Sequence, residues 1–166
     1  MIEQLVDSGS VEDYTRTWWD VRPHPRFGTV EVRVMDAVTR VDDAIALAAY
    51  VQALVHHYAE APARRCHPVV AEENKWRAAR WGLDGQLIDF GKKSEVPMRA
   101  LALELVSFVD DVVDELGSRE HVNYVHTILK DGTSADRQLK VYRETGDLTR
   151  VVQHVVHETR PATMRV

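Results

Sequence analysis

The chain has 166 residues, of which 45% are hydrophobic and 28% charged, and its formal net charge is −5. This length and composition fit a globular protein with one sizeable core, and the acidic balance argues against nucleic-acid binding through a basic surface. A single cysteine, Cys66, excludes an internal disulfide and fits a reducing compartment. The chain has no signal-peptide pattern and no apolar run near the roughly 20 residues that span a bilayer. We therefore expect a soluble, cytoplasmic protein that does not bind membranes.

The amino-terminal part predicts a short helix over residues 2–9 and then two antiparallel strands. Residues 18–22 alternate in polarity, and the alternation resumes after Gly28, where Val30, Val32 and Val34 share one face. Two prolines between these runs cannot lie in a central ladder, so residues 23–27 are predicted to form the connection. Same-face neighbours on a strand are roughly 6.5–7 Å apart, so Glu31 and Arg33 should lie side by side on the other face.

The remainder of the chain predicts mostly helices. A helix over residues 41–60, with Thr39 or Asp42 as its cap, is apolar almost all round and should be buried. A break at 61–68 precedes a helix at 71–81, a short strand at 87–90 and a long helix at 97–116. Three further helices are predicted near 119–130, 135–145 and 148–159, with Ser118, Ser134 and Asp147 as N-caps and Gly132 and Gly146 as stops. Strands followed by helices indicate an α+β fold.

Three stretches together carry a resemblance to a known family: WWDVRPHPRFGTVEVRVMD at residues 18–36, EENKWRAARWGLDG at 72–85 and ADRQLKVYRETGDL at 135–148. The chain resembles the ATP-dependent carboxylate–amine ligases of the glutamate–cysteine ligase type 2 family, which are related in fold to glutamine synthetase. Family members are much longer. The resemblance therefore implies that residues 1–166 are a single domain, the carboxy-terminal portion of a larger catalytic domain.

The resemblance also implies a chemistry and the residues that perform it. ATP and Mg²⁺ would convert glutamate to γ-glutamyl phosphate, which the amino group of cysteine or another amine would attack, a reaction of glutathione biosynthesis. Such phosphoryl transfer needs carboxylates for the metal ion and arginines for the phosphate oxygens. Glu31 is the candidate metal ligand and catalytic residue, together with Arg33. The candidates for binding substrate or nucleotide are Arg22, Arg26, Asn74, Arg77 and Arg80.

Other interpretations of these residues stay open. By alternation alone, Glu31 and Arg33 form a surface ion pair on a solvated sheet face, and Arg77 and Arg80 are surface charges. Arg137 and Gln138 are weaker candidates, on what looks like an ordinary amphipathic helix. The whole chain can also be interpreted as a non-catalytic remnant or a helical interaction module, which would self-associate as a homo-oligomer through exposed apolar surface. A third and weaker hypothesis is a helical metal-binding domain that uses His154 and His157.

Overall fold

A computed structural model describes residues 2–60 and 67–160 of the chain. They form two compact units, the first ending at Ala37 and the second beginning at Val38. Cys66 and most of the break predicted at 61–68 lie outside the described residues. The prediction that residues 1–166 form a single domain stays a prediction.

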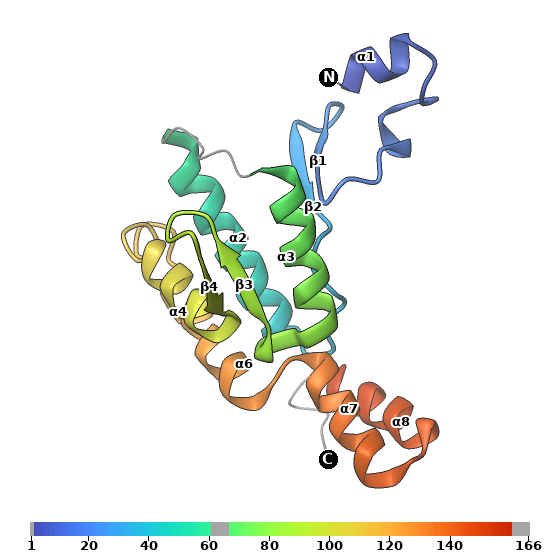
Figure 1. The fold of residues 1–166 in the computed structure, drawn as a ribbon, viewed down its shortest axis with the longest axis vertical. Helices are drawn as coiled ribbons and strands as arrows, with labels where there is room; N and C mark the ends of the chain where they lie inside the picture. The colour runs from blue at the N-terminus through green and yellow to red at the C-terminus, as the bar shows by residue number, and fades with distance from the viewer. Residues whose placement is uncertain (1, 61–66, 161–166) are drawn as a thin grey trace. The chain divides into compact units, whose positions relative to one another are not determined.

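The first unit is built around the β-hairpin that the sequence predicts (Figure 1). It contains α1 (Ile2–Asp7), a 3-10 turn η1 (Tyr14–Arg16), β1 (Val21–His24) and β2 (Thr29–Val32). The strands pair antiparallel with Arg22 opposite Glu31. One prediction is wrong in detail, because Pro23 lies within β1, opposite Val30, and not in the connection. In the described part of the chain β1 pairs with β2 alone, and an edge strand tolerates a residue that has no N–H to donate.

The second unit is mostly helical and confirms the α+β class. Its elements are α2 (Val41–Glu60), α3 (Pro68–Trp81), η2 (Gly82–Asp84), β3 (Gln86–Asp89), β4 (Ser94–Pro97), α4 (Met98–Phe108), α5 (Arg119–Asn123), α6 (Val125–Asp131), α7 (Ser134–Thr145) and α8 (Leu148–Glu158). The bounds of α2 agree with its apolar pattern, and Gly82, Gly132 and Gly146 end helices as expected. Strand β4, the partner of β3, was not predicted.

Several predicted helix boundaries are wrong. The single helix expected over 119–130 is two helices, α5 and α6, which meet at Tyr124. The long helix expected to reach Leu116 ends at Phe108, because the next residues include two aspartates and the β-branched Val112 and Val113, which are poor helix formers. Helix α7 is capped by Thr133 rather than Ser134: the Thr133 hydroxyl accepts from the Asp136 amide, and the Asp136 carboxylate accepts from the Thr133 amide. Of the predicted caps, Asp147 is confirmed, since its carboxylate accepts from the Thr149 amide at 2.8 Å.

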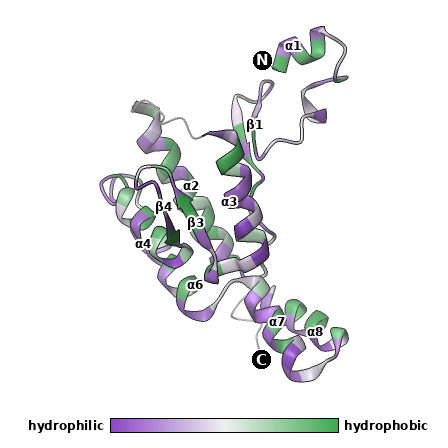
Figure 2. Cartoon of the chain, viewed as in Figure 1, coloured by the Kyte–Doolittle hydropathy of each residue, from purple (hydrophilic) through white to green (hydrophobic). Residues whose placement is uncertain are grey.

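The hydrophobic core of the second unit is made of small residues. It joins α2 to the turns after α4 and to α5 through Ala49, Ala53, Val109, Val112, Val113 and Val122. Alanines on α2 allow its backbone to approach α5 closely. The expectation that α2 is buried all round is wrong for the described residues, because Ile45, Val55 and Tyr58 are 41%, 55% and 43% exposed. In Figure 2, helices α2 and α8 carry more hydrophobic residues than helix α3. None of the helices in the described residues is long and apolar enough to cross a membrane.

Helices α7 and α8 supply no residue to this core cluster. They are tied to α2 by a buried polar network centred on Arg137, whose guanidinium donates to Asp43 at 2.8 Å and to Glu158 at 2.9–3.1 Å. Asp43, Arg137 and Glu158 are all less than 10% exposed. The Thr39 hydroxyl, which the sequence suggested as a helix cap, instead donates to Glu158 at 2.6 Å. Buried charges are tolerated only when paired and hydrogen-bonded in this way.

Replacement of Arg137 by alanine should remove about 3–5 kcal/mol from the free energy of unfolding, because Asp43 and Glu158 would stay buried without their shared cation. Urea denaturation followed by circular dichroism measures the change. Arg143→Ala, at an exposed position of the same helix, is the matched control and should change stability by less than about 0.5 kcal/mol. A loss below about 1 kcal/mol for Arg137→Ala would contradict the stabilising role of the network.

The network should also make the protein acid-sensitive. Burial disfavours the ionised form of Glu158, but hydrogen bonds from Thr39 and Arg137 outweigh it, so the pKa of Glu158 lies below its usual value of 4.5. The folded state therefore keeps this carboxylate ionised at pH values where the unfolded chain takes up a proton. This stabilisation is complete above about pH 4.5 and is lost as the pH falls through the folded-state pKa.

Urea denaturation between pH 7 and 3 tests this expectation. Glu158→Gln should flatten the acid limb of the stability curve, because the variant no longer has this carboxylate to protonate. Glu144→Gln, at an exposed position of α7, is the control and should leave the acid limb unchanged. Equal acid limbs in the wild type and Glu158→Gln would show that Glu158 is not the titrating group.

Candidate functional site

One face of the β1–β2 hairpin carries a fixed charge cluster. Arg22 and Glu31 are register partners, so their side chains project to the same face, and the Arg22 guanidinium donates directly to the Glu31 carboxylate. Arg22 is only 8% exposed, and its Nη1 also donates to the backbone oxygen of Thr15 at 2.9 Å. Arg22 therefore holds Glu31 from one side and is itself anchored to the chain before the strand.

Glu31 has a second arginine on its other side. Its Oε1 lies 3.8 Å from Arg33 Nη1, which agrees with the expectation that Glu31 and Arg33 are neighbours on one face. The Arg33 guanidinium stacks over the Trp18 ring, 4.9 Å from its centroid. The backbone N–H of Arg33 donates to the backbone carbonyl oxygen of Asp20 at 2.7 Å. The side chains of Glu31 and Arg33 are 43% and 31% exposed, so both are accessible to a ligand while their positions are defined.

Arg26 lies apart from this cluster, in the turn between the strands. It is exposed, and its guanidinium is 5.7 Å from the centroid of the Phe27 ring. Phe27 in turn stacks on His24 with centroids 4.4 Å apart, and Gly28 closes the turn with a φ of 61°, a conformation that favours glycine. Arg26 is therefore an exposed cation that is available to a ligand, but no contact in the described residues directs it at Glu31.

A Mg²⁺ site needs about six oxygen ligands in near-octahedral geometry. Glu31 is one hard ligand, but it lies between two guanidinium groups that neutralise its charge. Across residues 2–60 and 67–160, no group of three or more His, Cys, Asp and Glu side chains is placed to hold a metal ion. The described residues therefore do not fit Mg²⁺ by themselves, and they offer no support for the zinc hypothesis at His154 and His157.

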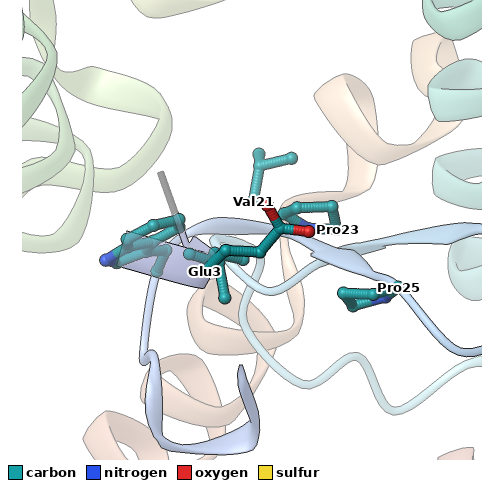
Figure 3. A pocket seen from close by; sticks show the side chains of 6 residues that line it. Glu3, Val21, Pro23 and Pro25 are labelled. Carbon is teal, nitrogen blue, oxygen red and sulfur yellow. The ribbon is translucent and has the colours of Figure 1, made fainter. Parts of the chain in front are cut away.

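The opposite face of the hairpin is apolar and hollowed. A pocket of about 390 Å³ lies between α1 and β1 and is lined by Ile2, Glu3, Trp19, Val21, Pro23 and Pro25. Figure 3 shows Glu3 beside Val21 and Pro23 of β1, with Pro25 in the turn that follows the strand. Alternate residues of one strand share a face, so the positions of Val21 and Pro23 follow from strand periodicity, whereas the position of Glu3 does not.

In the second unit, the hydrogen bonds of Asn74 are with the neighbouring hairpin. The Asn74 amide nitrogen donates to the Ile88 oxygen at 2.9 Å, and its amide oxygen accepts from the Ile88 backbone N–H at 2.8 Å. This pair of bonds fixes β3 against α3. Asn74 was predicted to bind substrate or nucleotide. That role stays a prediction, and the observed bonds show a structural one.

Arg77 and Arg80 also have partners within the second unit. Arg77 donates to Glu73 at 2.8 Å and to Glu95 on β4 at 2.7 Å, and these bonds raise the pKa of Arg77 above its usual value. Arg80 stacks on Trp81 with its guanidinium carbon 4.4 Å from the ring centroid. Arg77 also donates to the backbone oxygen of Gln86 on β3 at 3.1 Å, so it links α3 to both strands of the second hairpin. Arg80 is the more exposed of the two arginines and has no ion pair in the described residues.

Arg137 is the residue whose importance the sequence underestimated. The sequence pattern predicts an ordinary amphipathic helix around Arg137, whereas the structure places Arg137 at the centre of a buried network with Asp43 and Glu158. The neighbouring Gln138 has a local role, since it donates to the Ser134 hydroxyl at 3.1 Å. The partners of Arg137 are 94 and 21 residues away in the sequence, so no local pattern could identify them. The one signal in the sequence was that Arg137 lies in a stretch that resembles the family.

Comparison with known proteins identifies the class. The model of glutamate-cysteine ligase family 2 (GCS2) matches residues 1–154, and the chain belongs to this family. Similar proteins include those of Roseiflexus sp. strain RS-1, 53% identical, and Chloroflexus aurantiacus, 50% identical, each over 163 residues. A protein of Solibacter usitatus is 45% identical over the same length. All three carry the provisional name glutamate–cysteine ligase 2.

These matches cover 95% of the chain but only 42–43% of the relatives. The chain thus spans less than half the length of the curated relatives that it matches. Membership of a ligase family is established by the sequence, and the charge cluster of the first hairpin lies within the matched residues.

Asn74→Ala should lower the free energy of unfolding by about 1–3 kcal/mol with no ligand present, because the Ile88 N–H and carbonyl would both lose their partner. Hydrogen exchange of the Ile88 amide should become faster in the same variant. Lys75→Ala, at the adjacent exposed position, is the control and should change stability by less than about 1 kcal/mol. Unchanged stability and Ile88 exchange in Asn74→Ala would contradict the structural role.

Proposed function

We propose that the protein acts as an ATP-dependent carboxylate–amine ligase that joins glutamate to cysteine. An oxygen of the glutamate γ-carboxylate attacks the γ-phosphorus of ATP, which gives an acyl phosphate and releases ADP. The cysteine amino group then attacks the acyl carbon, and inorganic phosphate leaves as the amide bond forms. The proposal rests on family membership and on the names of the relatives, which concern proteins of more than twice this length.

The observation that carries the proposal is that Glu31 lies between Arg22 and Arg33 on the first hairpin, within the residues that the family model matches. Buried Arg22 fixes one oxygen of Glu31 in place, so the carboxylate is held with little freedom left to lose on binding. Arg33 lies on the accessible side, where its remaining donors can bind a carboxylate or phosphate oxygen in the two-pronged way typical of arginine. A pre-positioned cation of this kind stabilises negative charge that develops during phosphoryl transfer.

Mg²⁺, when bound, would supply positive charge that neutralises the phosphate groups of ATP. Glu31 would be the one carboxylate of the hairpin to contact Mg²⁺, and the described residues do not fit the ion by themselves. Arg26 is exposed on the adjacent turn and is available to a phosphate group. In this proposal Arg22 is a positioning residue, whereas Glu31 and Arg33 contact substrate.

A second candidate function is a non-catalytic interaction module. It is favoured by the exposed apolar residues of the first unit, where Trp18 is 78%, Phe27 68% and Val30 56% exposed. Such surface is unusual on a monomeric protein and would bury itself by self-association. Sedimentation velocity tests this alternative, which expects a concentration-dependent dimer or larger homo-oligomer without turnover of ATP.

The purified chain should release ADP and phosphate from Mg²⁺-ATP faster when glutamate and cysteine are both present. Glu31→Gln removes the charge of the carboxylate and should lower kcat by roughly 100-fold or more. Arg33→Ala should lower kcat/KM to a similar extent, since it removes a cation that binds substrate. A coupled assay for ADP measures both effects.

Glu12→Gln is the matched control, because it neutralises an exposed carboxylate of the same unit that pairs with Arg16. It should leave turnover unchanged. Turnover in Glu31→Gln equal to that of the wild type would exclude the proposed role of Glu31. Absence of turnover in a folded, monodisperse wild-type sample would exclude the claim that this chain is sufficient for catalysis.

A further inference from the structure

The β1–β2 hairpin has two outer edges, and the register shows which backbone groups each edge presents. In the described residues β1 and β2 pair only with each other. The backbone N–H of Arg33 donates to the Asp20 oxygen, so these two residues form a hydrogen-bonded pair of the antiparallel ladder. Such pairs alternate with pairs whose backbone groups point outward. By this alternation Pro23 and Val30, which are register partners, direct their backbone groups to the two outer edges.

The two edges differ in their capacity to accept another strand. On the β1 edge Pro23 has no N–H to donate, and Pro25 follows two residues later. The β2 edge has no such obstacle, because residues 29–35 contain neither proline nor glycine. The N–H and carbonyl groups of Val30 and Val32 point outward there, and no turn or loop in the described part of the chain hydrogen-bonds to them. An open row of this kind is a template for another strand.

The side chains of β2 make this edge complementary to itself. When two copies pair antiparallel with Val32 opposite the partner's Val32, Glu31 lies opposite the partner's Arg33 and Arg33 opposite the partner's Glu31. Val30 then lies opposite the partner's Val34, so the apolar side chains also match. The outward backbone groups of Val30 and Val32 meet those of the partner's Val34 and Val32, as an antiparallel ladder requires.

Other antiparallel registers lose one of these matches. A shift of the partner strand by two residues keeps the hydrogen bonds, but it places Glu31 opposite the partner's Glu31 or Arg33 opposite the partner's Arg33. A shift by one residue places valines opposite charged side chains and outward backbone groups opposite inward ones. The register centred on Val32 is therefore the one that satisfies both the charges and the ladder.

We propose that two copies of this chain associate through their β2 strands and form a continuous four-stranded antiparallel sheet. The twofold axis passes beside Val32, and the same patch is used on both copies. Val30 and Val34, which are 56% and 48% exposed, then pack side by side across the interface. The partner's Arg33 adds a cation beside Glu31. The inference rests on neither proposed function: it holds whether or not the chain turns over ATP, and it needs the backbone edge rather than apolar surface alone.

Sedimentation velocity over a range of protein concentrations tests the pairing, and the wild type should show a monomer–dimer equilibrium. Val32→Pro removes an outward N–H but no bond of the β1–β2 ladder. It should raise the dimer Kd at least about tenfold, because two symmetry-related hydrogen bonds are lost. Val21→Pro is the matched control, since it removes the outward N–H of the register partner on the β1 edge. It should leave the Kd within about twofold.

Charge variants test the same interface if Val32→Pro does not fold. Arg33→Glu places like charges opposite each other at two positions of the interface, so it should raise the dimer Kd at least about tenfold. Arg33→Lys keeps the positive charge and should stay within about threefold of the wild type. Equal Kd values for Arg33→Glu and the wild type would contradict the proposed register.

Oxidative cross-linking on a Cys66→Ser background locates the twofold axis. Opposite Cα atoms of a hydrogen-bonded pair are about 5.5 Å apart, within disulfide range, so Val32→Cys should give a disulfide-linked dimer. Val30→Cys is the control and should not cross-link, because its copy lies roughly 13 Å away along the strand.

Three results would overturn the proposal: a monomer at every concentration, equal changes of Kd in Val32→Pro and Val21→Pro, or stronger cross-linking by Val30→Cys than by Val32→Cys. A dimer that Val32→Pro does not weaken would indicate association through apolar surface and would also overturn edge pairing. A dimer with the expected pattern in a sample that does not turn over ATP supports edge pairing and contradicts the ligase proposal alone.

Discussion

The buried pairing of Arg137 with Asp43 and Glu158 is the interaction on which the second unit most depends. The apolar core of that unit joins α2, α5 and the turns after α4, and it contains no residue of α7 or α8. The attachment of these two helices is therefore polar at its centre, with the start of α2 held to the end of α8 through one guanidinium. A polar joint of this kind is geometrically specific, since each donor has a defined acceptor, and it is sensitive to the loss of any member.

The same physical rule explains the cluster on the first hairpin. Arg22 is buried, and its two terminal nitrogens donate to Glu31 and to backbone oxygens of Thr15 and Thr17, which leaves Glu31 fixed and half exposed beside Arg33. In the second unit the network fixes helices, whereas on the hairpin the fixed groups face solvent. This difference in exposure makes the hairpin the candidate site for chemistry and Arg137 a stabilising residue. Both the hairpin and Arg137 lie within the residues that the family model matches.

Asn74 and Arg77 show the limit of assigning function by residue type. Both are polar residues on one helix face in a stretch that resembles the family, and both form bonds to the β3–β4 hairpin in the structure. A side chain that holds a strand in place and one that holds a ligand have the same polarity and the same helical spacing.

Local patterns were sufficient for the α+β class, for α2 from Val41 to Glu60, for the hairpin and for the glycines that end helices, because periodicity and backbone preference act over a few residues. The resemblance in three stretches also identified the family. Three local features were missed: the end of α4 at Phe108, the pairing of β4 and the Thr133 cap. At these positions the apolar spacing of a helix is opposed by residues of low helix propensity or by local side-chain hydrogen bonds. The partners of Arg137 were beyond prediction. They lie up to 94 residues away, and only the packing of α2 against the last two helices brings their charges together.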